Sequence, residues 1–193
     1  MATFNLTKYY SKQGLWSLFL ICAFPLHIWT LFMGFRDFDW VTARTNSWDA
    51  VGVVSYGLLF SLFESLIVFA TTALLGLLIS RKWNEKKRIA LLGTLVIILS
   101  LWSIVNQTYF IRTMQFPEQL SAFYINTGRP LVVLYLTALL LVSISIVIPT
   151  YAILVSPKTE KIVLEGFDRF STLMILYLVF DVISLTIILI RNL

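Results

Sequence analysis

The sequence has few of the residues that interrupt, cross-link or solvate a chain. Its 193 residues include one cysteine, one histidine, five prolines and eight glycines, and only 13% of its residues are charged. One cysteine, Cys22, excludes an intramolecular disulfide, and one histidine, His27, provides no pair of imidazoles for a haem or a metal ion. So low a charge excludes a soluble enzyme, a disordered tail and a nucleic-acid-binding domain. We therefore expect no metal, no cofactor and no nucleic-acid partner.

Apolar residues are abundant instead. They make up 59% of the chain, against about 45–50% in soluble domains, and the mean hydropathy is +0.86. A membrane-spanning helix needs about 20 apolar residues, and a chain in lipid must satisfy its backbone within helices or a closed barrel. The sequence therefore predicts an all-α helical bundle, a single integral membrane domain covering residues 1–193. Its five transmembrane helices are expected at residues 15–35, 51–80, 89–111, 131–155 and 170–190.

The orientation follows from the basic residues, which account for the net charge of +5. With the N-terminus in the cytoplasm, ten of the fifteen Lys and Arg residues fall on the inner side and five on the outer side. Most of this difference comes from the basic segment at residues 81–88. Because cytoplasmic segments of membrane proteins carry the excess of Lys and Arg, we expect a cytoplasmic N-terminus and a cell membrane, plasma or inner.

Two connections between the expected spans have recognisable patterns. In the second outer connection, Phe116, Leu120, Phe123 and Tyr124 follow one another at helical spacing around Pro117. This pattern predicts a short helix that lies in the membrane interface. On the inner side, residues 156–161 are polar and are expected to form a simple turn.

Three ionisable and two amide side chains stand inside the apolar segments. His27, Glu64 and Asp181 lie near the middle of three different spans, and Asn106 and Gln107 lie closer to the outer face. Ionisable groups are costly at that depth and usually mark a function or pair with one another. We expect these residues to form an intramembrane polar cluster. It would either relay protons or bind a cation, or it would join helices through hydrogen bonds.

Small residues form a stripe along the second span. Gly57, Ser61 and Ser65 are spaced four residues apart, and Thr72 and Gly76 continue the pattern. Small residues at this spacing let a neighbouring helix approach closely. Because Glu64 lies beside the stripe, we expect its side chain to point into the bundle.

The first outer connection concentrates acids, arginines and tryptophans. Carboxylates beside indole rings could recognise a lipid or polyprenyl headgroup, whereas tryptophans and charges at a membrane boundary also form an ordinary aromatic belt. The candidate residues of this set are Asp37, Asp39, Trp40, Arg44, Trp48 and Asp49.

Three functions remain open at this point. The short connections and the lack of any known catalytic motif favour a non-catalytic accessory or scaffold subunit of a membrane complex, in contact with protein partners or with further copies of itself. The first alternative is a small proton or cation transporter that uses the buried acids. The second alternative is a membrane enzyme that acts on a lipid headgroup at the outer face.

Overall fold

A computed structural model describes residues 9–80, 83–111 and 117–193. All secondary structure in these ranges is helical, and five helices are long and apolar enough to cross a membrane. The prediction of an all-helical chain with five membrane-length helices is confirmed. Lys8, Arg81, Lys82, Arg112 and Phe116, which entered the expectations on orientation and on the interfacial helix, lie outside the described residues. The elements are α1 (Lys12–Arg44), α2 (Ser47–Leu78), α3 (Glu85–Asn106), the π-helical turn η2 (Gln107–Ile111), α4 (Glu118–Asn126), α5 (Pro130–Val155) and α6 (Pro157–Asn192).

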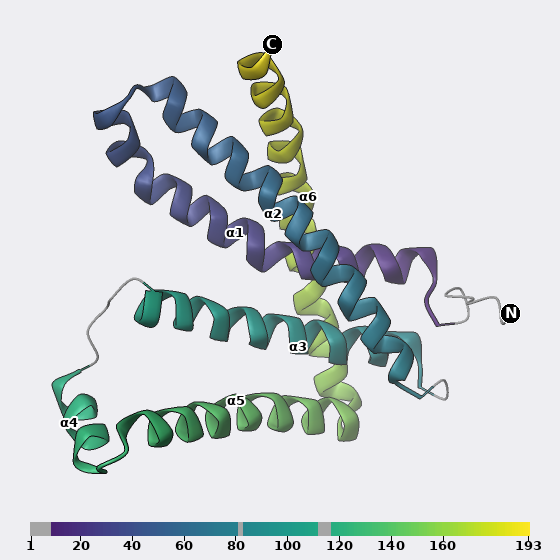
Figure 1. The fold of residues 1–193 in the computed structure, drawn as a ribbon. Coiled ribbons are helices and arrows are strands. Elements are labelled where there is room, and N and C mark those ends of the chain that lie inside the picture. Colours follow the sequence, from purple (N-terminus) through teal and green to yellow (C-terminus); the bar gives the residue numbers. More distant parts are fainter. Residues whose placement is uncertain (1–8, 81–82, 112–116) are drawn as a thin grey trace, which may run out of the picture.

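Helix α1 is the centre of the bundle. It packs against α2, α3 and α6, and residues 18–23 are buried without interruption, so every face of this stretch is covered. A helix that is apolar on all sides is accommodated either in such a position or in lipid. Helices α2 and α3 lie on different sides of α1 and spread apart from their connection (Figure 1).

The long helices alternate between two ends of the bundle. We call one of them the basic end, which holds the start of α1, the connection between α2 and α3, and the turn between α5 and α6 (Figure 1). Side-chain contacts join these three segments. Ser11 N and Oγ donate to Glu85 Oε1 at 2.7 and 2.9 Å, and Lys87 Nζ donates to the carbonyl of Leu154 at 2.9 Å. The turn between α1 and α2 and helix α4 lie at the opposite end.

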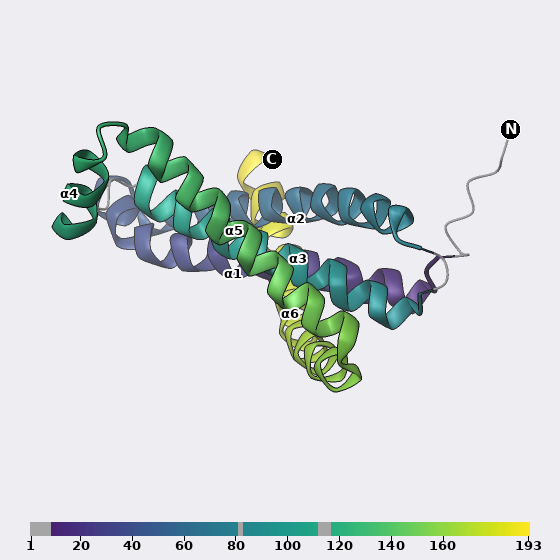
Figure 2. The same ribbon diagram turned by 90° about the horizontal axis from the view of Figure 1, so that it is seen from below.

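Helix α5 is the least covered of the long helices. It lies on the side of α3 that faces away from α2 (Figures 1 and 2), and Ile153 is its only residue with a fully buried side chain. A hydrogen bond of 2.9 Å from Trp102 Nε1 to Ser145 Oγ holds it to α3. Its remaining surface is made mostly of large aliphatic side chains, which is typical of a helix that faces lipid.

Two helices are much longer than the expected spans. Helix α1 continues through residues 36–44, which we expected to be a loop, and α6 begins at Pro157, so the turn expected at residues 156–161 is wrong. The hydrogen bonds at the starts of α2 and α6 show how short the two turns are. Asn46 Oδ1 accepts from Asp49 N at 2.9 Å, and Ser156 Oγ accepts from Thr159 N at 3.3 Å. Each capping residue starts a helix immediately after the previous one has ended.

The short helix expected in the second outer connection is present as α4, directly after Pro117. Leu120 and Phe123 on this helix are exposed in the isolated chain. An amphipathic helix that lies in the interface would bury such side chains in lipid. Its position at the membrane surface stays a prediction.

Candidate functional site

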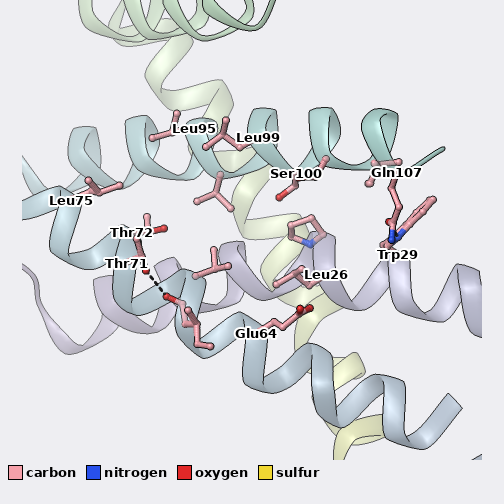
Figure 3. A pocket seen from close by; sticks show the side chains of 16 residues that line it. Leu26, Trp29, Glu64, Thr71, Thr72, Leu75, Leu95, Leu99, Ser100 and Gln107 are labelled. Carbon is pink, nitrogen blue, oxygen red and sulfur yellow. Dashed lines mark hydrogen bonds between the residues drawn. The ribbon is translucent and has the colours of Figure 1, made fainter. Parts of the chain in front are cut away.

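The described bundle has a space of about 740 Å³ at the basic end, lined in part by charged side chains, and a groove of about 450 Å³ between α1, α2 and α3 (Figure 3). We call the latter the lateral groove. Helix α1 provides one wall, and α2 and α3 provide the others, because these two helices spread apart on either side of it. The lining is mostly aliphatic. Its polar and aromatic residues are Trp29 on α1, Glu64, Thr71 and Thr72 on α2, Ser100 and Ser103 on α3, and Gln107 in η2.

The two faces of α2 explain how Glu64 reaches this groove. The predicted stripe of small residues packs toward α1: Ser61 and Ser65 are buried, and the hydroxyl of Ser61 bonds to that of Thr30. Gly57, Thr72 and Gly76 lie on the same stripe, and a side chain at Gly76 would overlap the hydroxyl of Tyr10. Successive helical residues are about 100° apart. Glu64 therefore lies on the neighbouring face, which borders the groove.

Glu64 is the charged residue of the lateral groove. Its side chain is half-buried, and within the described part of the chain it has neither a hydrogen-bond partner nor an ion pair. Glu64 and Ser100 lie on opposite walls (Figure 3). A charged side chain near the bilayer centre costs roughly 2.5–3.5 kcal/mol on insertion scales. Lipid tails cannot provide this carboxylate with a counter-charge, so the groove is suited to an occupant that can.

Trp29 and Gln107 join two walls at one end of the groove. The indole Nε1 of Trp29 donates to Gln107 Oε1 at 2.5 Å, and the indole ring stacks on Phe32 with 5.9 Å between the ring centroids. Gln107 begins the π-helical turn η2, and such turns are frequent at functional sites. The bond and the stacking together fix the orientation of the Trp29 ring.

His27 and Asp181 form a separate site on the other side of α1. His27 Nε2 and Asp181 Oδ2 are 2.9 Å apart, and the two residues are 0% and 3% exposed. His27 Nδ1 lies 2.9 Å from the carbonyl oxygen of Ala23. The second carboxylate oxygen, Asp181 Oδ1, is buried and has no partner among the described residues. This contact joins α1 to α6 deep inside the bundle, out of reach of the groove.

The predicted intramembrane cluster is thus divided into three parts. His27 and Asp181 form one pair, Glu64 and Gln107 line the lateral groove, and Asn106 is exposed and lines neither site. The hydroxyl groups of Ser100 and Ser103 were missed by the sequence reasoning. Their spacing to Gln107, at i, i+3 and i+7, is the signal that could have identified a polar face on α3.

The predicted outer set does not converge on one pocket. Asp37 accepts from Arg36 Nε at 2.7 Å, Arg44 stacks on Trp40 at 3.9 Å, and Asp49 is paired with Arg191 at 2.7 Å. Asp39 is exposed, and Trp48 lies under Arg191. Of the six, Asp37 lines a small space of about 170 Å³ between α1 and α2.

Metal chemistry needs several ligands around one point. Within residues 9–80, 83–111 and 117–193, no three His, Cys, Asp or Glu side chains come close enough to hold a metal ion. No protein-family model, curated protein or solved structure matches this chain.

Proposed function

We propose that the protein is a non-catalytic accessory subunit of a membrane complex, and that its task is to hold a hydrophobic molecule in the lateral groove. The observation that carries the proposal is the position of Glu64, half-buried in an apolar groove with no partner in the described bundle. Two pairs of other polar side chains in the spans make structural contacts: His27 and Asp181 join α1 to α6, and Trp102 and Ser145 join α3 to α5. Glu64 is the carboxyl group that faces the groove without such a contact.

The shape of the groove supports binding. Pockets that bind small molecules have volumes of roughly 300–1,000 Å³, mostly apolar walls and a few fixed polar groups. The lateral groove has about 450 Å³, aliphatic walls on three helices, and one carboxylate. A ligand dissolved in the bilayer would enter it from the side.

Assembly with another membrane protein is supported by α5, which leaves nearly its whole length uncovered. That surface is available to a partner or to a second copy of the chain, and otherwise to lipid. The basic end would lie in the cytoplasm, in a plasma or inner membrane, as the distribution of Lys and Arg favours.

Labelling with a hydrophobic carbodiimide tests the groove, because this reagent reaches carboxyl groups from the lipid phase. In proteoliposomes we expect an adduct on Glu64 and none on the sealed Asp181, read by mass spectrometry of peptides. Ser100→Trp places an indole across the groove and should prevent the adduct. Leu101→Trp, at an exposed position on the same helix, should leave it unchanged. An unlabelled Glu64, or equal labelling in Ser100→Trp, would contradict the proposal.

The second candidate is transport of protons or cations. Two observations favour it. The carboxyl group of Glu64 faces the groove, and a second acid, Asp181, has a buried oxygen without a partner among the described residues. Proton or cation flux into proteoliposomes distinguishes the two functions. A transporter loses its flux in Glu64→Gln, whereas an accessory subunit shows no flux before or after the substitution.

A further inference from the structure

The charge of the lateral groove is not balanced by the chain. Among the residues that line it, Glu64 is the only ionisable one, and the described bundle brings no Lys, Arg or His side chain to its carboxylate. An isolated carboxyl group in an apolar environment is either protonated or ionised beside a cation. A cationic ligand is the partner that would keep Glu64 ionised in the groove.

The indole ring of Trp29 provides a second binding group for a cation. Trp29 lines the same groove, and its hydrogen bond to Gln107 holds the ring in place before any ligand arrives. Organic cations bind to the faces of aromatic rings, to tryptophan most strongly, and this attraction grows when water is excluded. A carboxylate and a fixed indole ring in one apolar groove are a combination that selects ammonium-like cations over anions and over neutral hydrocarbons.

The size of the groove decides between a small molecule and a protein segment. A helix with its side chains is about 10–12 Å wide and would occupy far more than the groove provides along the length of its walls. A volume of about 450 Å³ fits a ligand of drug size. The occupant is therefore a small molecule rather than a transmembrane helix of a partner.

We infer that the lateral groove binds a hydrophobic organic cation, with the cationic centre between Glu64 and the ring of Trp29 and the apolar groups against α2 and α3. This inference rests on the proposed binding function and names its ligand class. The hydroxyl groups of Ser100 and Ser103 accept hydrogen bonds from a cation that carries N–H groups.

Two probes of nearly the same shape and opposite charge test the inference. Tetraphenylphosphonium is a hydrophobic cation, and tetraphenylborate is the matching anion. Equilibrium binding is measured on the full chain in lipid nanodiscs. We expect saturable binding of the phosphonium in the groove and no saturable binding of the borate there, each measured above the partitioning of the ion into empty nanodiscs. Glu64→Gln should weaken phosphonium binding at least about tenfold, since the charged partner is lost, and Glu64→Asp should weaken it less.

Glu118→Gln is the matched control, because it removes an exposed carboxylate on α4, far from the groove, and should not change the affinity. Equal affinity in wild type and Glu64→Gln, or saturable borate binding at this site, would overturn the inference. A fold defect in Glu64→Gln is recognised by comparing its thermal unfolding with that of Glu64→Asp.

The failure of this inference and that of the proposed function give different results. If a neutral hydrophobic molecule protects Glu64 from the carbodiimide while Glu64→Gln binds the phosphonium normally, the groove binds ligands but does not select cations. If Glu64 is unlabelled and neither probe binds, both proposals fail. A photo-crosslinker at Leu99, on the groove wall, tests whether a protein segment occupies the groove. A protein adduct in native membranes would contradict the inference that the ligand is a small molecule.

Discussion

His27 on α1 and Asp181 on α6 are 154 positions apart in the sequence, and their Nε2 and Oδ2 atoms lie 2.9 Å apart. The carbonyl of Ala23 can only accept, so His27 Nδ1 donates to it and carries a hydrogen. The contact between Nε2 and Oδ2 then needs one more proton, which belongs either to the imidazolium or to the carboxylic acid. In both cases the pair is neutral as a whole, which lets it stay buried in the membrane.

The first prediction separates the hydrogen bond from the charge. In Asp181→Asn, the side-chain amide donates to Nε2 of a neutral His27, so we expect stability close to that of the wild type. In Asp181→Leu, Nε2 is left buried without a partner, which costs about 1–3 kcal/mol. Thermal unfolding in detergent micelles measures both variants. Equal loss in Asn and Leu would show that the charge, and not the bond, holds α1 to α6.

A second prediction concerns the close packing of α3 on α6 at Gly93. A methyl group there would lie 2.5 Å from Phe167 Cε2 and 3.2 Å from Ile21 Cγ2, and both side chains are buried. We expect Gly93→Ala to lower the free energy of unfolding by about 1–3 kcal/mol, because the ring of Phe167 must move. Gly166→Ala is the control. Its added methyl group meets nothing within 4 Å and should be neutral or slightly stabilising.

In the double variant Gly93→Ala with Phe167→Leu, the smaller side chain provides space for the methyl group. It should lose less stability than the two single changes together, since residues in contact are not additive. Additive losses would mean that the two residues do not share this contact.

The third prediction concerns Arg88 at the basic end. Arg88 is buried, its Nη1 donates to the carbonyl of Tyr9 at 2.6 Å, and its Nη2 donates to the carbonyl of Ser80 at 3.2 Å. Burial raises the pKa of Tyr10, against the opposing effect of the nearby Arg88 guanidinium, so the neutral phenol donates to the carbonyl of Ala73 at 3.4 Å. The guanidinium thus holds the segment before α1 against the start of α3.

Lysine has one ammonium group and cannot span both carbonyls in this way. Arg88→Lys should therefore release the start of α1, seen as faster amide hydrogen exchange at residues 9–14. Arg169→Lys, at an exposed position on α6, is the matched control and should leave the exchange unchanged. If both variants exchange alike, Arg88 acts only through its charge.

The number of long helices could be predicted from the sequence because bilayer thickness sets the length of an apolar segment. The ends of the helices could not. Hydropathy indicates where the apolar, lipid-facing segment ends. A helix, in contrast, ends where its terminal backbone groups are capped. Residues 36–44 are polar and aromatic, yet they remain helical up to the turn before Asn46.

For the candidate site, only the depth of the polar residues in the membrane could be predicted from the sequence. His27, Glu64 and Asp181 are all near mid-span, but whether their side chains meet depends on the rotation of each helix about its axis. On α1, His27 faces α6 while Leu26 and Trp29 face the groove, and this choice is made by the long-range packing of α2, α3 and α6. Composition likewise could not distinguish the buried Arg88 from the exposed Lys86, two residues earlier in the same basic segment.

The last prediction tests the path of α6 across the membrane. Arg191, near its end, donates from Nη2 to Asp49 Oδ1 at 2.7 Å and from Nη1 to the carbonyl of Trp48. The pair is partly exposed and contributes at most about 1 kcal/mol, so its loss does not unfold the chain. Since Cys22 is the only cysteine, cysteines placed at positions 49 and 191 in a Cys22→Ala background should be joined by a short bifunctional maleimide. A pair at positions 49 and 161 is the control, because Lys161 lies near the start of α6, beside the basic end, and should not be joined to position 49.

Single cysteines at 49 and 191 should both react with a membrane-impermeant maleimide on intact cells, and a cysteine at 161 should react only after the cells are opened. If positions 49 and 191 react from opposite sides, α6 does not cross the membrane beside α2, and the geometry of the bundle described above is wrong.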